Sequence, residues 1–366
     1  MNFELSEDQR MIVDAAVGFV RKQSPVTRMR KLRDDDRGWS PDTWRQMGEL
    51  GWLGLPFPES IGGFGGSLVD VALVLEQLGT TLVPEPMASS LTAGMTILRA
   101  GDEAQHKAWL APMIEGKASL ALAWAERESR YDATKVATSA ERIRAGYRLS
   151  GHKQFVLDGH AASQLVVSAR CDGAVALFVI DATTPGVRVR PLRTLDGRRA
   201  AAIDFEDVVF GDDRRLGREG ATALAYALDV GAALACAEGV GIMRAVLAMT
   251  TEYLRTREQF GVKIGSFQVL QHRAVDMFVE LELAYSMALA AAIQVDQPAT
   301  VSAAKAQLAE SGRFVTQQAI QLHGGIGITD EHDVGLYFKR MHALNAMYGD
   351  AEYHIARFAT LVQSTR

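Results

Sequence analysis

Residues Tyr253–Met277 read YLRTREQFGVKIGSFQVLQHRAVDM, and this stretch decides how the C-terminal part of the chain folds. It begins with helix-forming residues and is interrupted at Phe260-Gly261, where glycine permits a turn. Ser266 can cap a second helix after the turn. That helix is predicted to bury Val269, Leu270, Ala274, Val275 and Met277. The stretch therefore predicts two helices joined by a short turn.

Arg257 and Gln268 flank this turn, one near the end of a helix and one near the start of the next. A guanidinium and an amide held on rigid helix ends can bind an anion, and a phosphate group is the obvious candidate. The alternative is an ordinary helix–loop–helix with surface charges. The spacing alone leaves both interpretations open.

The composition is that of a soluble globular protein. The chain has 366 residues, of which 48% are apolar and 23% are charged. This length is enough for two or three domains. A net charge of −5 gives no reason to expect a nucleic-acid partner.

The N-terminus MNFELSEDQR is acidic and lacks the apolar region of a signal peptide. No uncharged run is long enough to span a bilayer, so no membrane partner is expected. Cys171 and Cys236 share no motif, which excludes a disulfide framework and suits a reducing cytoplasm. The histidines show no metal spacing, and no metal site is expected.

The first 118 residues predict a helical domain. Ser6, followed by Glu7 and Asp8, favours a helix start, with the acids placed to stabilise the positive end of the helix dipole. Ser40-Pro41 is a second such start. The segment Leu55–Gly66 holds two prolines and four glycines, which predicts a shaped loop.

The pattern changes near residue 119. Short apolar or alternating runs then recur at intervals of roughly ten residues, which is typical of a β sandwich or barrel. These runs are Leu120–Ala125, Tyr147–Leu157, Leu165–Ala169, Val175–Ile180, Val187–Pro191 and Ala201–Phe210. Residues 119–216 therefore predict a middle β domain.

Residues 217–366 are rich in alanine and predict long helices with short joints. The expected helices are Gly220–Thr256, Ser266–Val295, Thr300–Leu322 and Asp333–Val362. Such helices favour an antiparallel four-helix bundle. The predicted fold class is therefore α+β, with a helical domain, a β sandwich or barrel, and a helical bundle in that order.

Glycine-rich turns offer a second candidate ligand site. Gly325-Ile326-Gly327 and Gly239-Val240-Gly241 lack the third glycine of a dinucleotide motif, which argues against a Rossmann fold. Gln321–Gly325 (QLHGG) ends a predicted bundle helix. A glycine C-cap explains one of its two glycines. A second glycine lets a ligand approach the backbone closely, so a cap and a ligand contact both remain open.

Four motifs in order extend along most of the chain: GWLGLPFPESIGGFGG (residues 51–66), GHKQFVLDGHAAS (151–163), TREQFGVKIGSFQ (256–268) and QLHGGIGIT (321–329). With them the chain resembles the acyl-CoA dehydrogenase family, including bacterial members that act on steroid side-chain thioesters. The resemblance implies FAD lying between the β domain and the bundle of a dimer or dimer of dimers. It also implies an acyl-CoA substrate and an electron acceptor.

In the family, an Arg-x-x-Phe-Gly motif with a later glutamine, and a Gln-x-x-Gly-Gly turn, reach across the interface to the FAD of the neighbouring subunit. The resemblance assigns this role here to Arg257, Phe260, Gly261, Gln268, Gln321, Gly324 and Gly325. All of these positions match the family's motifs.

The positions that serve a subunit's own flavin match less well. The family's Thr-Glu-Pro-x-Ala-Gly-Ser-Asp loop reads AERESRYD at Ala125–Asp132, so only Glu126 and Asp132 survive. Ala125 replaces the threonine that bonds the isoalloxazine. Leu157 replaces the threonine of the next flavin-contacting strand. Charged side chains follow where the family has a tight turn beside the pyrophosphate.

The expected reaction removes the α-proton of the thioester with a carboxylate, because this weakly acidic C–H must be met at contact distance. The family's usual base position is Tyr348 here, and an alternative position falls near Gly231. Glu238, two helical turns beyond Gly231, can substitute, or it can form an ion pair. Asp350 can also substitute, or it can cap a helix or contact the neighbour's adenine.

The sequence therefore leaves two hypotheses about function open. The chain is either an FAD-dependent acyl-CoA dehydrogenase that introduces an α,β double bond, or the companion subunit of a heteromeric dehydrogenase. The companion would supply contacts to its partner's FAD while its own site is empty. The matched trans positions beside the substituted cis positions motivate the second hypothesis.

Overall fold

The computed structural model describes residues 4–217 and 219–363. The chain divides into two compact units, each built from segments that are distant in sequence. The first unit comprises residues 1–31, 68–83 and 232–366, and the second comprises residues 32–67 and 84–231. Helix α8 (Gly220–Thr256) begins in the second unit and ends in the first.

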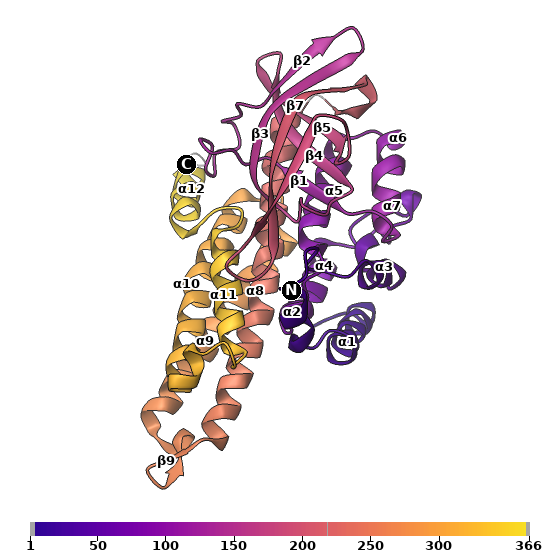
Figure 1. Cartoon of the computed structure of the whole chain (residues 1–366). Coiled ribbons are helices and arrows are strands. Elements are labelled where there is room, and N and C mark those ends of the chain that lie inside the picture. The colour runs from indigo at the N-terminus through magenta and orange to yellow at the C-terminus, as the bar shows by residue number, and fades with distance from the viewer. Residues whose placement is uncertain (1–3, 218, 364–366) are drawn as a thin grey trace. The chain divides into compact units, whose positions relative to one another are not determined.

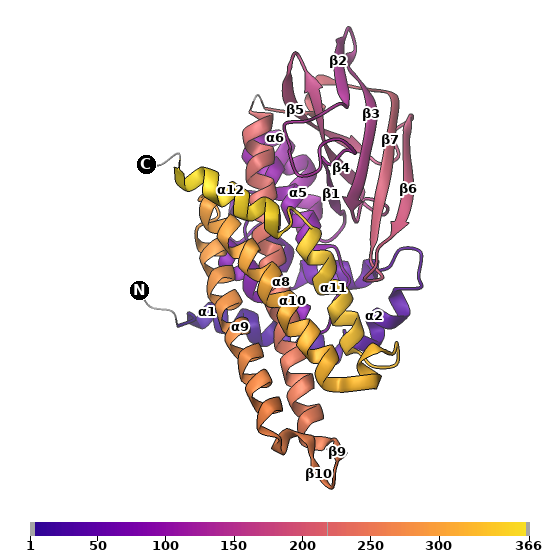
Figure 2. The ribbon, with the colours of Figure 1, turned by 90° about the vertical axis from the view of Figure 1, so that its left-hand side faces the viewer.

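The first unit is helical. Ser6 caps its first helix through a capping box with Gln9, as the predicted helix start requires. Helix α10 packs against α9, α11 and α12. Figure 2 shows α9 and α11 running alongside it. The helices are α1 (Glu7–Lys22), α2 (Val26–Leu32), α4 (Leu68–Gly79), α9 (Gln268–Ile293), α10 (Pro298–His323), α11 (Val334–Ala346) and α12 (Ala351–Gln363), together with the end of α8.

The prediction of one continuous fourth helix over Asp333–Val362 is wrong. The chain forms α11 and α12 instead, with a turn over residues 347–350 between them. Tyr348 and Gly349 take φ angles of 58° and 121° in this turn, which no helix accommodates. The apolar spacing continues on both sides of the break, so the periodicity did not reveal it.

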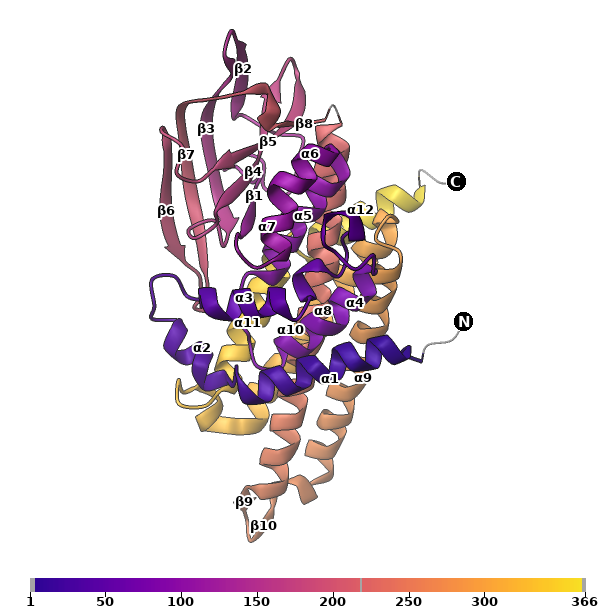
Figure 3. The ribbon, with the colours of Figure 1, turned by 90° about the vertical axis from the view of Figure 1, so that its right-hand side faces the viewer.

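The second unit contains the larger of the two sheets. Its strands follow the hydrogen-bonded order β6-β7-β3-β2-β4-β5-β8, and β1 pairs with β4 outside this order. Figure 3 shows β6, β7 and β3 side by side. Buried Tyr147, Phe178, Ile203 and Phe205 contribute to the core of these strands. The strands are β1 (Leu120–Ala123), β2 (Ser139–Ile143), β3 (Gly146–Leu157), β4 (Gln164–Cys171), β5 (Ala174–Asp181), β6 (Val187–Arg193), β7 (Arg199–Phe210) and β8 (Arg215–Leu216).

Strand β2 was not predicted from the sequence. It reads SAERI, and only Ala140 in it is buried, so it lacks the apolar alternation of its neighbours. Its position comes instead from antiparallel pairing with β3, from Ser139 opposite Ser150 to Ile143 opposite Gly146. Tertiary pairing therefore overrides a weak local pattern here.

Helices accompany the strands in the second unit. Ser40 caps α3 (Pro41–Glu49) as predicted, and α5 (Met87–Ala100) packs on β1. Short helical segments follow at α6 (Glu103–Gln105), His106–Leu110 and α7 (Ala111–Ile114). The N-terminal helices are thus shared between the two compact units. The three-domain division at residues 118 and 216 stays a prediction.

Helix α8 is the one helix in the described ranges that is long and apolar enough to cross a membrane. However, 83% of its most apolar window is buried inside the protein. Core helices of soluble proteins share these features, so the helix is weak evidence for a membrane span.

Candidate functional site

The arm, defined here as residues 257–268, joins α8 to α9. Its two short strands, β9 (Glu258–Gln259) and β10 (Val262–Lys263), pair antiparallel around the two-residue turn Phe260-Gly261. Both turn residues have positive φ, 55° and 78°, as a type I′ hairpin requires. Figure 1 shows β9 at the end of the α8–α9 pair. The predicted chain break at Phe260-Gly261 is confirmed.

Two details of the arm differ from expectation. Ser266 does not cap α9: its Oγ donates to the Lys263 carbonyl at 2.7 Å, and the helix begins at Gln268 without a side-chain cap. Met277 is fully buried, but Val269 and Val275 are 61% and 58% exposed. The predicted burial of these two valines is therefore wrong for a single chain.

Phe278, Val279 and Leu283 on α9 are also about half exposed, and together with the two valines they are called the apolar row here. Exposed polar residues such as His272 and Asp276 lie between them in the sequence. Helical periodicity correctly predicted the burial of Met277, but it did not identify Phe278, Val279 and Leu283 as part of an exposed apolar set. An extended apolar row on a single chain is typical of a protein-contact surface.

The Gly-Gly turn, Gly324-Gly325, follows α10 directly. Gly324 has a φ of 63° and ends the helix, so its lack of a side chain has a structural reason. Gly325 has no such reason, because its φ is not positive and an added Cβ would meet nothing within 4 Å. Its open backbone fits the alternative that a ligand approaches this turn closely.

An aromatic stack within the first unit joins the end of α8, which precedes the arm, to the end of α10, which precedes the Gly-Gly turn. The Tyr253 ring, one helical turn before Arg257, stacks on the His323 ring with centroids 4.6 Å apart. The His332 ring lies 4.5 Å from that of His323. His323 is buried, and burial lowers its pKa, so the neutral ring is favoured. Its Nδ1 donates to the Ala319 carbonyl at 2.8 Å.

The arm and the turn offer an exposed set of groups for an anionic ligand. Arg257, Gln268 and Gln321 are all exposed. Among the residues that the structure describes, their side chains make no hydrogen bond or ion pair. A guanidinium without a carboxylate partner, amide donors and an open glycine suit the diphosphate of FAD. The groups present therefore fit the cofactor that the resemblance implies.

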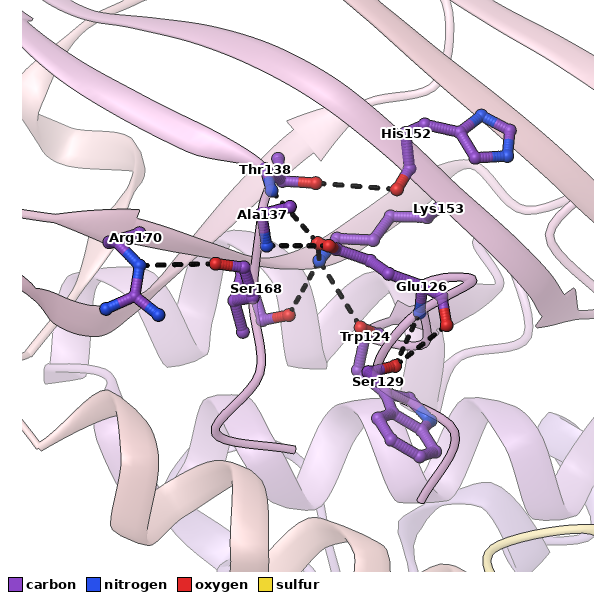
Figure 4. A network of polar contacts seen from close by, with 10 residues as sticks. Trp124, Glu126, Ser129, Ala137, Thr138, His152, Lys153, Ser168 and Arg170 are labelled. Carbon is purple, nitrogen blue, oxygen red and sulfur yellow. Dashed lines mark hydrogen bonds and ion pairs between the residues drawn. The ribbon is translucent and has the colours of Figure 1, made fainter. Parts of the chain in front are cut away.

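The second group of site residues lies in the flavin loop, defined here as residues 125–138 of the second unit. The loop lacks one family hydroxyl, at Ala125, and β3 lacks the other, at Leu157. It keeps a left-handed turn residue, Arg130 at a φ of 46°, where the family has glycine. Glu126 pairs with the buried Lys153 at 2.6 Å, as Figure 4 shows.

The Glu126–Lys153 pair was missed by the sequence reasoning. The available signal was Lys153 itself, a lone charge in the otherwise apolar alternation of Tyr147–Leu157. An inward-facing lysine in a strand needs a buried acceptor.

The two candidate bases lie in different environments of the first unit. Glu238 is 4% exposed and receives two bonds from Arg340, from Nε and Nη2, both at 2.8 Å. This is the ion pair that the sequence offered as the alternative role. A carboxylate held by a buried bidentate arginine is poorly suited to accept a substrate proton, so the structure argues against Glu238 as the base.

Asp350 lies in the turn between α11 and α12 and is half-buried. Its Oδ1 accepts from the Tyr353 N–H at 2.9 Å, which is the predicted cap, while Oδ2 makes no hydrogen bond in the described chain. Lys305, fully buried on α10, donates to the Gly349 carbonyl at 2.9 Å and the Asn345 carbonyl at 3.2 Å. Asp350 therefore keeps one oxygen available on a turn that Lys305 anchors.

Comparison with known proteins covers the whole chain. Three family models match, for the N-terminal domain (residues 6–117), the middle domain (121–212) and the C-terminal domain (218–362) of acyl-CoA dehydrogenase. Acyl-CoA dehydrogenase IpdE2 from Mycolicibacterium smegmatis is 31% identical, with 96% of this chain and 98% of that protein covered.

Two solved structures are similar over the full length. The ChsE4-ChsE5 complex from Mycobacterium tuberculosis has a TM-score of 0.93 at 26% identity and covers 100% of both chains. A variant of the Tcur3481-Tcur3483 steroid ACAD has a TM-score of 0.90 at 27% identity and covers 98% of both chains.

Proposed function

The chain belongs to the acyl-CoA dehydrogenase family, and on this basis we propose that it oxidises the Cα–Cβ bond of an acyl-CoA thioester with FAD. A protein carboxylate takes the α-proton, and bound FAD supplies the acceptor for the β-hydride. The product is the α,β-unsaturated thioester. The observation that carries the proposal is the match of all three family domains in order along the chain.

The proposed FAD contacts are those of the arm and the Gly-Gly turn. Arg257 and Gln268 would bind the diphosphate, and Phe260 and Gly261 would shape the hairpin that presents them. Gln321, Gly324 and Gly325 would contact the same cofactor. Their exposure and lack of partners within the described chain support this assignment. By resemblance, the cofactor that they contact is that of the adjacent subunit.

Asp350 is the proposed base, in place of the Tyr348 that occupies the usual base position. Its free Oδ2 and its position on the anchored turn support the assignment. Its carboxylate also caps α12, so a test must separate the two roles. Asparagine caps a helix about as well as aspartate but cannot accept a proton.

The second candidate function is that of a companion subunit in a heteromeric dehydrogenase. The missing hydroxyls at Ala125 and Leu157 and the tyrosine at position 348 favour it. Heteromeric assembly is described for the ChsE4-ChsE5 complex, to which this chain is similar. In this case the arm would serve a partner's FAD, and this chain's own site would be empty.

Two further observations support a substrate class and an assembly. Similarity to a steroid ACAD supports a bulky steroid side-chain thioester as the acyl group. The apolar row on α9 supports an oligomer, a dimer or dimer of dimers with an identical or different acyl-CoA dehydrogenase subunit. We also propose a cytoplasmic enzyme that passes its electrons to a separate acceptor.

The test uses the purified full chain with its flavin absorbance and its acyl-CoA-dependent reduction of an artificial acceptor. Bound flavin and turnover support the stand-alone enzyme. Absence of flavin in the chain alone, with one FAD per pair after mixing with a partner dehydrogenase, would overturn it in favour of the companion.

Asp350→Asn tests the base. We expect turnover to fall by about 10²–10⁴-fold, the usual contribution of general acid–base catalysis, with the melting temperature unchanged because the cap remains. Glu352→Gln, an exposed neighbour on α12, is the matched control. Unchanged turnover in Asp350→Asn would exclude Asp350 as the base.

A further inference from the structure

The flavin loop is closed by a single carboxylate. Oε2 of Glu126 accepts from the Ala137 N–H at 2.6 Å, and Oε1 accepts from the Thr138 N–H at 3.1 Å. Glu126 stands at the start of the loop and the two amides at its end, so the side chain connects one end to the other. Figure 4 shows these bonds converging on Glu126.

Lys153 fixes this closed loop to the sheet. It projects from β3 with no exposed surface, and its Nζ has three acceptors. These are Oε1 of Glu126 at 2.6 Å, Oγ of Ser168 on β4 at 3.0 Å and the Trp124 carbonyl at 3.3 Å. All three N–H groups of the ammonium are therefore used. One side chain therefore links Trp124, the residue between β1 and the loop, to Glu126 in the loop and to Ser168 on β4.

The electrostatics agree with a structural role for the Glu126–Lys153 ion pair, which is called the clasp here. Burial lowers the pKa of Lys153 to about 8, although its bond to Glu126 opposes the shift. Burial raises the pKa of Glu126, but the bonds from Lys153, Ala137 and Thr138 outweigh it, and the net pKa is lowered. A buried ion pair is tolerated only when its remaining polar atoms are satisfied, as they are here.

The other family residue that survives in the loop also makes local bonds. Oδ1 of Asp132 accepts from the backbone N–H and the hydroxyl of Thr134, at 3.0 and 2.6 Å. The two surviving acids, Glu126 and Asp132, thus hold the shape of the loop. Of the substituted positions between them, Arg127 and Glu128 are 84% and 90% exposed at their side chains. Ser129 is buried and also supports the loop: its Oγ accepts from the Glu126 N–H at 2.8 Å and donates to the Glu126 carbonyl at 2.9 Å.

We propose that Lys153 is a positioning residue which, through Glu126, holds the flavin loop in the conformation that receives the chain's own flavin. The proposal rests on the proposed function for its ligand. It assigns Glu126 a role in the shape of the loop rather than in direct contact with the flavin.

The experiment compares Lys153→Met with the wild type by limited trypsin digestion of the apo-protein and by flavin titration. Trypsin cuts after Arg127 and Arg130, inside the loop. We expect cleavage there to become about tenfold faster and flavin binding about tenfold weaker, since a hydrogen bond to a charged group contributes about that factor. Lys305→Met is the matched control: it removes an equally buried lysine from the other unit and should leave loop cleavage unchanged.

Glu126→Gln is a milder second variant in case Lys153→Met does not fold. It keeps one carbonyl acceptor and should give a smaller increase in loop cleavage. Loop cleavage at the wild-type rate in both variants would overturn the clasp. Faster cleavage with unchanged flavin affinity would overturn the link to the flavin. If the wild type binds no flavin, the proposed function fails, while the cleavage rates still decide whether Lys153 holds the loop.

Discussion

The arm that carries Arg257 and the flavin loop that begins at Ala125 differ in where their polar groups find partners. Within the described chain, the guanidinium of Arg257 and the amide of Gln268 have none, and Phe260 at the tip of the arm is 90% exposed. In the flavin loop, Glu126 has three donors and Lys153 has three acceptors, all from the same unit.

The comparison separates two reasons for keeping a residue. The arm keeps polar side chains that have no hydrogen-bond partner in the described part of the chain, which indicates a ligand or a second subunit. The loop keeps only the acids that satisfy its own backbone. A motif such as the arm, whose polar side chains have no partner in the described chain, indicates binding. A motif such as the loop acids, which bond to their own backbone, indicates a role in folding.

The largest expected effect on FAD binding comes from the arm. Arg257→Ala should weaken FAD binding by up to about a hundredfold, because charge-assisted bonds to a phosphate contribute roughly 1.5–3 kcal/mol. Stability should not change, since the Arg257 side chain makes no hydrogen bond or ion pair with the described residues. Arg255→Ala, two residues earlier and equally exposed, is the control. An equal loss of FAD affinity in both variants would show that Arg257 contributes only positive charge and is not a specific FAD ligand.

The pH dependence of the free energy of unfolding tests the role of Lys153 in the loop. The pKa of Lys153 is about 8 in the fold against an ordinary 10.5. Between these values the unfolded chain holds a proton that the folded chain has released, so unfolding takes up a proton and this group makes stability rise with pH. The slope is at most about 1.4 kcal/mol per pH unit. Urea unfolding should show this rise in the wild type and a flatter curve in Lys153→Met.

The Gly-Gly turn should give a moderate effect on binding alone. Gly325→Ala adds a Cβ that meets nothing in the chain, so stability should stay level or rise by about 0.4–1 kcal/mol. FAD binding should fall by about tenfold, because the methyl group occupies the space of close backbone approach. Unchanged flavin affinity would show that the open space at Gly325 has no ligand in it.

The smallest expected effect is a gain. Ala125→Thr returns one hydroxyl to the flavin loop and should tighten FAD binding about fivefold, the value of one ordinary hydrogen bond. Loop cleavage by trypsin should not change, since the clasp is untouched. Tighter binding would indicate that the loop still faces a flavin. No gain in affinity would favour a chain whose own site is empty.

The sequence was sufficient for the elements with strong local signals. Helix α8 has the predicted bounds, Gly220–Thr256, and the turn at Phe260-Gly261 is where glycine indicated it. The helix break at Tyr348-Gly349 was not predicted because the apolar spacing continues across it. Strand β2 was not predicted because pairing with β3, and not its own sequence pattern, makes it a strand.

The candidate site was only partly predictable. Motif residues of the arm could be named because the family keeps them in sequence. The partners of buried charges could not, since Glu126 and Lys153 are 27 residues apart and Glu238 and Arg340 are 102 apart. The chain alone gives the charge of a buried group, but only the fold gives the group that neutralises it.

The most direct test of the arm's role is a mixed dimer of Arg257→Ala and Lys153→Met chains, isolated with two affinity tags. If each arm serves the neighbour's flavin, one site combines a wild-type loop with a wild-type arm, and the mixed dimer should recover about half of the wild-type FAD in a two-fold assembly. If the arm serves its own chain, both sites carry one damaged part. Flavin content as low as that of the two single variants would contradict the account.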